Sequence, residues 1–175
     1  VKRAERDLSA GIDLGNLEQL VRMKNESEIE SSDQHIVNAV EFMLQHAFDT
    51  RASDIHVEPK RDFSLIRFRI DGVLHDIQSI PKIVHAAILS RLKTLSRLDI
   101  AEKRRPQDGR IKTTRAGKEI ELRVSTLPVA FGEKIVMRIF DPDVLMQDLS
   151  GLGFYPEETV VFNEFITRPH GIILV

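Results

Sequence analysis

Residues 110–139, RIKTTRAGKEIELRVSTLPVAFGEKIVMRI, alternate apolar and polar side chains and contain two short interruptions. Alternation with a period of two is typical of β-strands that bury one face, and small residues are typical of the turns between them. The most consistent pairing places the turn centres at Ala116-Gly117 and Ala130-Phe131. The stretch is therefore predicted to form a three-stranded antiparallel meander.

This pairing fixes which side chains stand opposite one another across the three strands. One predicted row is apolar and consists of Ile111, Leu122 and Ile139. A second row lies on the opposite face and consists of Arg110, Arg123 and Arg138. Three neighbouring cations require a compensating anion, because like charges directly opposite each other destabilise a sheet.

Two kinds of anion could compensate the arginine row. One kind is a carboxylate, for which the candidates are Glu121, Glu133 and Asp108. The other is a bound phosphate, since guanidinium groups bind phosphate oxygens through two parallel hydrogen bonds. The register alone leaves both possibilities open.

Two helices are predicted before the meander. Apolar residues recur at helical spacing between residues 33 and 49. A second helix is expected from Pro81 to about Leu98, with Arg91 and Lys93 pointing away from its apolar face. Both helices therefore have one face that can cover a sheet.

The segment between these helices predicts a β-hairpin. Strands are expected at 54–59 and 63–70, and Asp71-Gly72 is a favoured two-residue hairpin turn. The cross-strand pairs expected from this turn are Ile66 with Ile77 and Arg67 with Asp76.

A loop is expected between the second helix and the meander. Residues 106–109, PQDG, have the composition of a type I turn. The basic run Lys103, Arg104 and Arg105 precedes it. No aromatic platform for bases accompanies this run, so it favours a solvated loop or a subunit contact over nucleic-acid binding.

The last part of the sequence predicts one more helix and one more strand. Pro156 is expected to begin a helix, and residues 172–175 form an apolar run typical of a strand buried on both faces of a parallel sheet. In a P-loop ATPase such a strand leads into a glycine-rich phosphate-binding loop, a motif that we do not find in this sequence.

Composition restricts the class of protein. The chain has 175 residues, 42% of them hydrophobic, a net charge of −2 and no cysteine. Disulfide frameworks and thiolate metal sites are therefore excluded, and the absence of a secretory or membrane-spanning segment favours a cytosolic compartment. We expect a linker or short helix at 1–32, a first domain at 33–141, and a linker with the start of a second domain at 142–175.

A metal site is considered at Asp54, His56 and Glu58, which alternate along one predicted strand. Alternate strand residues share a face, so the three side chains could converge on an ion. Such a pattern more often forms only a polar surface, and we expect no metal here.

Six motifs carry a resemblance to a known family: ASDIHVEP at 52–59, RFRIDGVL at 67–74, LDIAEKRRPQDGR at 98–110, LRVSTLP at 122–128, GEKIVMRI at 132–139 and RPHGIILV at 168–175. In order and spacing they resemble the type II secretion and type IV pilus assembly ATPases, over nearly all of residues 33–175. The resemblance implies an α/β (α+β) fold, in which a PAS-like antiparallel sheet covered by helices is followed by the first helix and strand of a RecA-like P-loop NTPase domain.

The resemblance also implies a function. Members of this family are hexameric cytoplasmic motors at the inner membrane, which use ATP and Mg²⁺ to drive secretion or pilus assembly. Expected partners are the RecA-like domain of the same or an adjacent subunit, further copies in a homohexamer, and inner-membrane platform proteins, without nucleic acid. Because Walker A and Walker B motifs are not found, this chain alone is expected neither to hydrolyse ATP nor to bind nucleotide or Mg²⁺ tightly.

Site residues are transferred from the family position by position. Arg123 in LRVS and Arg138 in VMRI match the family arginines that reach the nucleotide phosphates, whereas Arg110 is a candidate by geometry alone. The sequence does not distinguish secretion from pilus assembly. A different class of interpretation stays open, a free-standing PAS-like binding or scaffold module without a nucleotide role.

Overall fold

The computed structural model describes residue 30 and residues 32–115, 117–141 and 148–174. The short helix or linker predicted for 1–32 lies almost entirely outside the described residues. The described residues fall into two compact units, which meet at the bond between Phe140 and Asp141.

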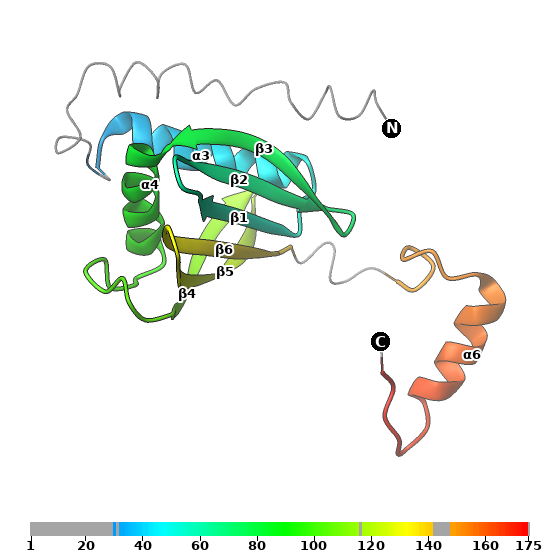
Figure 1. Cartoon of the computed structure of the whole chain (residues 1–175). Helices are drawn as coiled ribbons and strands as arrows, with labels where there is room; N and C mark the ends of the chain where they lie inside the picture. The colour runs from blue at the N-terminus through cyan, green and yellow to red at the C-terminus, as the bar shows by residue number, and fades with distance from the viewer. Residues whose placement is uncertain (1–29, 31, 116, 142–147, 175) are drawn as a thin grey trace. The chain divides into compact units, whose positions relative to one another are not determined.

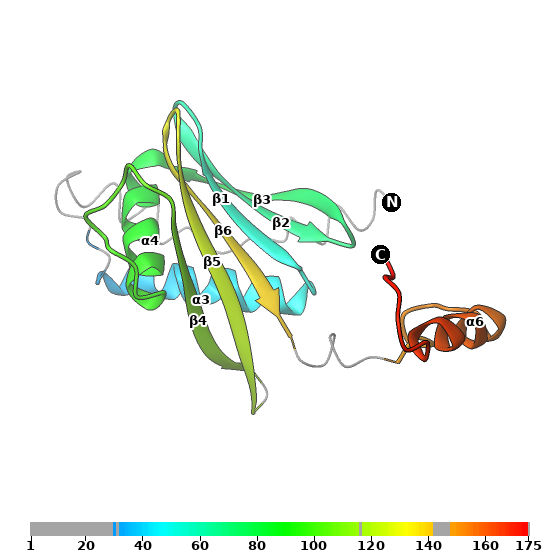
Figure 2. The same ribbon diagram turned by 90° about the horizontal axis from the view of Figure 1, so that it is seen from below.

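Within the described residues, the first unit combines one antiparallel sheet with two helices. Figures 1 and 2 show how these elements are arranged. In chain order its elements are α3 (Gln34–Asp49), β1 (Asp54–Pro59), β2 (Phe63–Ile70), β3 (Val73–Pro81), α4 (Lys82–Leu95), β4 (Gln107–Arg115), β5 (Lys118–Val129) and β6 (Gly132–Phe140). The strand order is β3-β2-β1-β6-β5-β4, so β1 and β6 join the hairpin to the meander at the centre of the sheet. The predicted α+β class, an antiparallel sheet covered by helices, is confirmed.

The hydrophobic core lies between one face of the sheet and the two helices. Its strand side chains include Ile55, Phe68, Leu122 and Met137, and α3 and α4 contribute residues such as Ile36, Met43, Ile88 and Leu92. Because successive strand residues point to opposite faces, the polar residues between these core positions lie on the other face. Neither α3 nor α4 covers that polar face (Figure 2).

The predicted register of the meander is confirmed. Arg115 pairs with Lys118, and Val129 pairs with Gly132, so both turns have the expected two-residue length. The apolar row pairs Ile111 with Leu122 and Leu122 with Ile139. The cationic row pairs Arg110 with Arg123 and Arg123 with Arg138.

The β2–β3 hairpin confirms one predicted pair and corrects the other. Asp71 and Gly72 both have positive φ, 49° and 81°, as a type I′ hairpin turn requires. The expected pairs were Arg67 with Asp76, which forms, and Ile66 with Ile77, which does not, because Ile66 stands opposite Gln78. A β-bulge between Ile66 and Arg67 causes this shift, since it leaves one extra residue on β3.

The type I turn predicted at 106–109 is wrong, because β4 already begins at Gln107. Gly109 has a packing role instead. A Cβ atom at this position would lie 2.6 Å from the carbonyl oxygen of Ser96 and 2.8 Å from Leu98 Cδ2. The glycine therefore lets β4 pass directly against the chain that follows α4.

Helix α4 differs from its prediction in length and in one buried residue. It ends at Leu95, and Arg97 has a positive φ of 58°, so the chain turns away before Leu98. Lys93 was expected to point away from the core, but it is only 1% exposed. Its ammonium group forms an ion pair with Glu133 at 2.7 Å and donates to the carbonyl oxygen of Glu102 at 2.7 Å.

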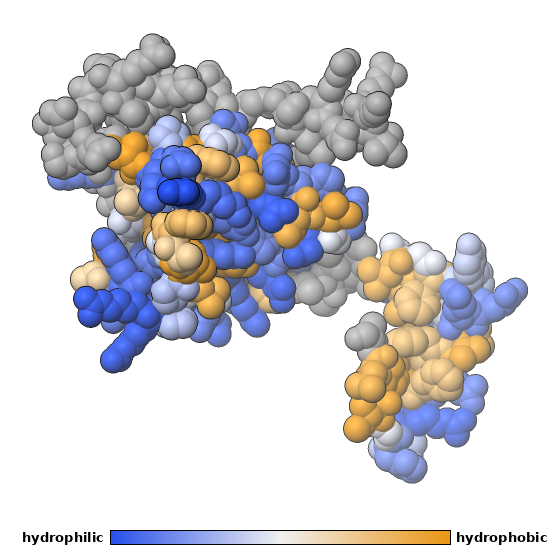
Figure 3. Space-filling view, viewed as in Figure 1, coloured by the Kyte–Doolittle hydropathy of each residue, from blue (hydrophilic) through white to orange (hydrophobic). Residues whose placement is uncertain are grey.

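The second unit contains the predicted helix, α6 (Pro156–Ile166). No α6 residue is buried, and apolar side chains gather on the surface of this unit in Figure 3. The strand predicted for 172–175 does not form in the described residues 172–174, and Val175 lies outside them. A parallel strand needs neighbours for its backbone hydrogen bonds, and the described residues hold only the sheet of the first unit.

Candidate functional site

The predicted arginine row is part of a longer row across the polar face of the sheet. Asp54 on β1 pairs with Arg138 on one side and Arg69 on the other. From β2 to β4 the row reads Arg69, Asp54, Arg138, Arg123 and Arg110. The row therefore contains four arginines and one aspartate, with Arg69 and Arg138 on the two sides of Asp54.

Asp54 is the anion that directly contacts arginines of the row. Its Oδ1 accepts a hydrogen bond from Arg138 Nε at 2.9 Å, and its Oδ2 lies 3.3 Å from Arg69 Nε and 2.8 Å from Ser53 Oγ. Burial alone would raise the pKa of Asp54, but hydrogen bonds from Arg138 and Ser53 and the charge of Arg138 outweigh it and lower the pKa. The ionised carboxylate is thus held between two guanidinium groups.

Arg123 and Arg110 are held less tightly. The Arg123 guanidinium lies over the Phe140 ring, 4.2 Å from its centroid, in a cation–π contact. Arg123 Nε and Arg110 Nη1 both lie 3.7 Å from Glu121 Oε1, longer than a hydrogen bond. The three arginines of the meander keep side-chain exposures of 66% for Arg110, 60% for Arg123 and 67% for Arg138.

The carboxylates proposed from the sequence have different positions. Glu121 lies beside the row as expected. Asp108 accepts a hydrogen bond from Ser125 Oγ at 2.5 Å. Glu133 lies on the core face with Lys93 and is not a partner of the row, because its strand position has the opposite parity from Arg138.

A recess of about 400 Å³ adjoins two of the arginines. It is lined by Asp108, Gly109, Arg110, Arg123, Val124 and Ser125. Arg110 on β4 and Arg123 on β5 therefore border the same recess, together with the Asp108 carboxylate.

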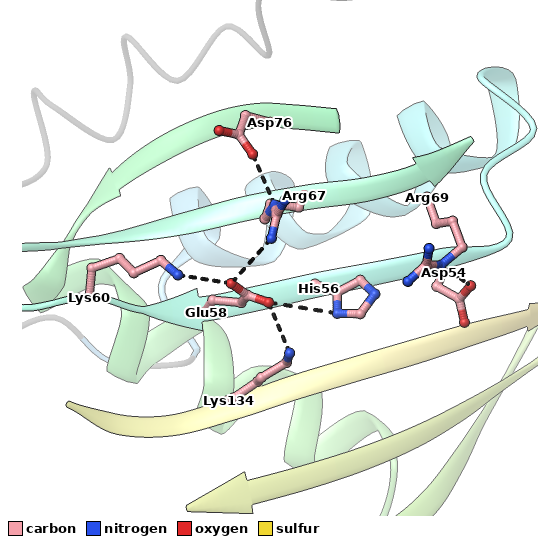
Figure 4. A network of polar contacts seen from close by, with 8 residues as sticks. All are labelled: Asp54, His56, Glu58, Lys60, Arg67, Arg69, Asp76 and Lys134. Carbon is pink, nitrogen blue, oxygen red and sulfur yellow. Dashed lines mark hydrogen bonds and ion pairs between the residues drawn. The ribbon is translucent and has the colours of Figure 1, made fainter. Parts of the chain in front are cut away.

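A second polar cluster surrounds Glu58, as Figure 4 shows. Its carboxylate lies 3.0 Å from Lys60 Nζ, 2.9 Å from Lys134 Nζ and 3.8 Å from Arg67 Nη1. Burial would raise the pKa of Glu58, but the hydrogen bonds and charges of Lys134 and Lys60 lower it to about 2. His56 lies beside this cluster, and burial together with the charge of Lys134 lowers its pKa.

The residues considered for a metal site alternate along β1 as predicted but are not an exposed polar surface. Asp54, His56 and Glu58 are all buried, because long side chains from the neighbouring strands cover them. Both carboxylates are already bound by cations. Among the described residues, no three histidine or acidic side chains are grouped so that they could hold a metal ion.

Sequence reasoning missed Asp54 as the partner of the arginine row. The β1–β6 pairing joins segments about 80 residues apart, as in the Asp54–Arg138 pair, so no turn of known length fixes it. A signal was available in the hairpin, because extending the β1–β2 register places Asp54 opposite Arg69.

The comparisons with known proteins identify the family of this chain. A family model described as "Type II/IV secretion system protein" matches residues 29–175. The type IV pilus assembly ATPase TfpB of Acinetobacter baylyi is 51% identical over 160 residues, which cover 91% of this chain and 27% of TfpB. Type II secretion system protein E of Xanthomonas campestris is 41% identical over 175 residues, which cover 100% of this chain and 29% of that protein.

A third relative, the type IV pilus assembly ATPase PilB of Myxococcus xanthus, is 48% identical over 147 residues, which cover 83% of this chain and 26% of PilB. The chain therefore spans between a quarter and a third of the length of these relatives. None of the described helices combines the length and apolar character needed to cross a membrane. With the family model matching most of its length, the chain belongs to the type II/IV secretion system protein family, as its motifs indicated.

Proposed function

We propose that this chain is the N-terminal part of an ATPase that powers type II secretion or type IV pilus assembly, and that it supplies arginines to the phosphates of ATP. Arg123 and Arg138 are the phosphate-contacting residues, and Arg110 is an accessory contact. The observation that carries the proposal is the row of three exposed guanidinium groups on adjacent strands, on the sheet face that neither α3 nor α4 covers.

The geometry of the row suits a polyphosphate. Neighbouring strands lie about 4.8 Å apart, so the row presents donors at regular intervals along one line. Glu121 is the nearest carboxylate to two of the arginines, at 3.7 Å, and it neutralises them only in part. Phosphoryl transfer builds negative charge on the transferred group, and well-placed arginines stabilise that charge in the transition state.

The remainder of the ATP site belongs to the larger protein. In this proposal residues 33–141 are the PAS-like domain and residues 142–175 begin the RecA-like domain. The RecA-like domain of the same or an adjacent subunit holds ATP and Mg²⁺ in a cytoplasmic homohexamer. Hydrolysis then moves the two domains against each other, and inner-membrane platform proteins receive that motion.

Single replacements of the arginines test this function. In the full-length ATPase, Arg123→Ala and Arg138→Ala should each lower the turnover number on the order of 100-fold or more, because each removes charge stabilisation from the transition state. Arg123→Lys and Arg138→Lys should restore only part of the activity, since lysine cannot form the paired hydrogen bonds of arginine. Steady-state ATP hydrolysis measures both effects.

The control is Lys112→Ala on the same face. Lys112 follows Arg110 by two positions on β4, and its ammonium group pairs with Glu119 at 2.7 Å, outside the row. It should hydrolyse ATP at the unmodified rate. Size-exclusion chromatography with light scattering establishes that each variant remains a hexamer, and near-normal turnover of the arginine variants as intact hexamers would contradict the proposal.

The alternative of a free-standing PAS-like ligand-binding module has no specific observation in its favour. Buried apolar side chains from the sheet and from α3 and α4 occupy the layer where such a ligand would bind.

A further inference from the structure

Arg138 differs from the other two arginines of the meander in how its side chain is held. Its Nε donates to Asp54 Oδ1 at 2.9 Å, while 67% of the side chain remains exposed. A carboxylate that contacts Nε leaves the two Nη groups at the end of the guanidinium for another acceptor. The guanidinium of Arg138 is therefore held at Nε, and its two Nη groups remain accessible.

The Asp54 carboxylate has a fixed position because three donors from different directions contact it. Besides Arg138, the carboxylate contacts Arg69 Nε at 3.3 Å and Ser53 Oγ at 2.8 Å, and the residue is only 4% exposed. Its strand, β1, lies in the interior of the sheet between β2 and β6. The position of the carboxylate is thus set by the sheet and not by a mobile loop.

Arg69 has a separate task in this arrangement. It donates through Nη1 to the carbonyl oxygen of Gly72 at 2.9 Å, which ties it to the β2–β3 turn while its Nε faces Asp54. Arg69 therefore neutralises the buried carboxylate from the side opposite Arg138. Asp54 therefore still has a positively charged neighbour, Arg69, when Arg138 also binds a phosphate.

We propose that Asp54 is the positioning residue of Arg138: it holds the guanidinium by Nε so that the Nη groups face the phosphate, and Arg69 is its permanent counter-ion. This inference rests on the proposed phosphate contact of Arg138. A free arginine side chain loses rotamer entropy when it is fixed. A guanidinium that is already fixed in the resting protein incurs less of this cost in the transition state.

The test uses Asp54→Asn in the full-length ATPase. Asparagine keeps the shape and one acceptor oxygen but removes the charge that holds Arg138. Displacement of a catalytic group by about 1 Å costs on the order of 100-fold, so we expect the turnover number to fall about 10-fold to 100-fold. The KM for ATP should change little, because the aligned charge acts mainly in the transition state.

A double-mutant cycle separates positioning from general damage. If Asp54 acts through Arg138, Asp54→Asn should cause no further loss of turnover in the Arg138→Ala background. The matched control is Asp76→Asn, which removes an exposed carboxylate from the same face, 2.9 Å from Arg67, without touching the row. It should leave turnover unchanged.

Ser53→Ala provides a second, milder variant should Asp54→Asn fail to form the hexamer. It removes one hydrogen bond to the carboxylate and should slow turnover a few-fold, again only when Arg138 is present. Unchanged turnover of Asp54→Asn, or equal losses in both backgrounds, would overturn the inference. Normal turnover of Arg138→Ala would instead overturn the proposed function, so the two failures are distinguishable.

Discussion

Glu58 shows how single residues of the polar sheet face tolerate burial of charge. Its carboxylate accepts hydrogen bonds from Lys60 and Lys134, and Arg67 adds a third positive charge at 3.8 Å (Figure 4). A buried carboxylate is stable only when such partners replace its lost hydration. The side chain thereby ties β1 to both of its neighbouring strands.

The pKa of Glu58 predicts an acid-sensitive contribution to stability. Its value of about 2 in the folded chain lies below the usual 4.5, so the unfolded state binds more protons between these values. The stabilisation is complete above pH 4.5 and is lost as the pH falls towards 2. Glu58→Gln should lower the unfolding free energy by about 2 kcal/mol at pH 7 and by much less near pH 2.

Urea denaturation of the 175-residue chain at several pH values between 7 and 2 measures this difference. Asp62→Asn, which changes an exposed carboxylate in the turn between β1 and β2, is a suitable control and should leave the unfolding free energy at pH 7 unchanged. Parallel stability curves for the unmodified chain and Glu58→Gln would show that Glu58 contributes no proton-linked stability.

Individual residues of the candidate site were predictable where two turns fixed the register. Arg110, Arg123 and Arg138 follow from the lengths of the meander turns alone. Asp54 could not be aligned with Arg138, because β1 and β6 are paired only through the complete fold. Lys93 was misjudged for a related reason, since its buried partner Glu133 lies on a distant strand.

At the scale of elements, one buried ion pair fastens α4 to the sheet. Lys93 on α4 contacts Glu133 on β6, and Lys93 also binds the carbonyl oxygen of Glu102 in the loop before β4. About two helical turns earlier on α4, His85 Nε2 donates to the carbonyl oxygen of Glu133 at 2.9 Å. Burial lowers the pKa of His85, which favours its neutral form.

Removing the cation of the Lys93–Glu133 ion pair should strongly lower the stability of the fold. Lys93→Met leaves the Glu133 carboxylate buried without its cation, and we expect the unfolding free energy to fall by about 3–5 kcal/mol. The double variant Lys93→Met/Glu133→Leu removes both charges and should recover most of that loss, because an apolar pair of similar volume needs no compensation. Chemical denaturation of the two variants, with Lys112→Ala as the exposed-lysine control, gives the comparison.

The unfolding free energies of the single and the double variant show whether the uncompensated charge sets the cost. A double variant as unstable as Lys93→Met would mean that packing volume, and not the uncompensated charge, sets the cost. A single variant as stable as the unmodified chain would show that the ion pair does not hold α4 in place.

Elements were predictable where one local signal dominated. Alternation and turn residues located β2, and amphipathic spacing located α3. The errors arose where a distant contact decides the structure. Gly109 pairs with Val124 on β5 and packs against the chain after α4, and residues 172–174 form no strand because their own unit has no described strand to pair with.

For the whole molecule, the two units differ in how much apolar surface they bury. The first has a continuous core between its sheet and two helices. In the second, α6 has no buried residue, and Val160, Phe165 and Leu174 are among its exposed apolar side chains. Since burial of apolar area is the main source of stability, the first unit should carry the stability of the chain.

A fragment of residues 1–140, which lacks only the second unit, tests this expectation. It should unfold in one cooperative transition with a midpoint within about 2 °C of that of the 175-residue chain, because removal of the second unit deletes no part of the core. Amide hydrogens of α6 in the longer chain should exchange far faster than those of β1 and β6. Differential scanning calorimetry and hydrogen exchange measure these two properties, and a midpoint much lower for the fragment would mean that the second unit contributes to folding.

The two-residue turns of the meander have a consequence for how this protein can evolve. Each turn is remote from the nucleotide chemistry proposed for the row, yet it determines on which side of the sheet the next arginine emerges. A single codon inserted or deleted there could send a guanidinium into the hydrophobic interior while every arginine codon stays intact. Selection on the proposed function should therefore constrain the length of these turns more strictly than their amino-acid identity.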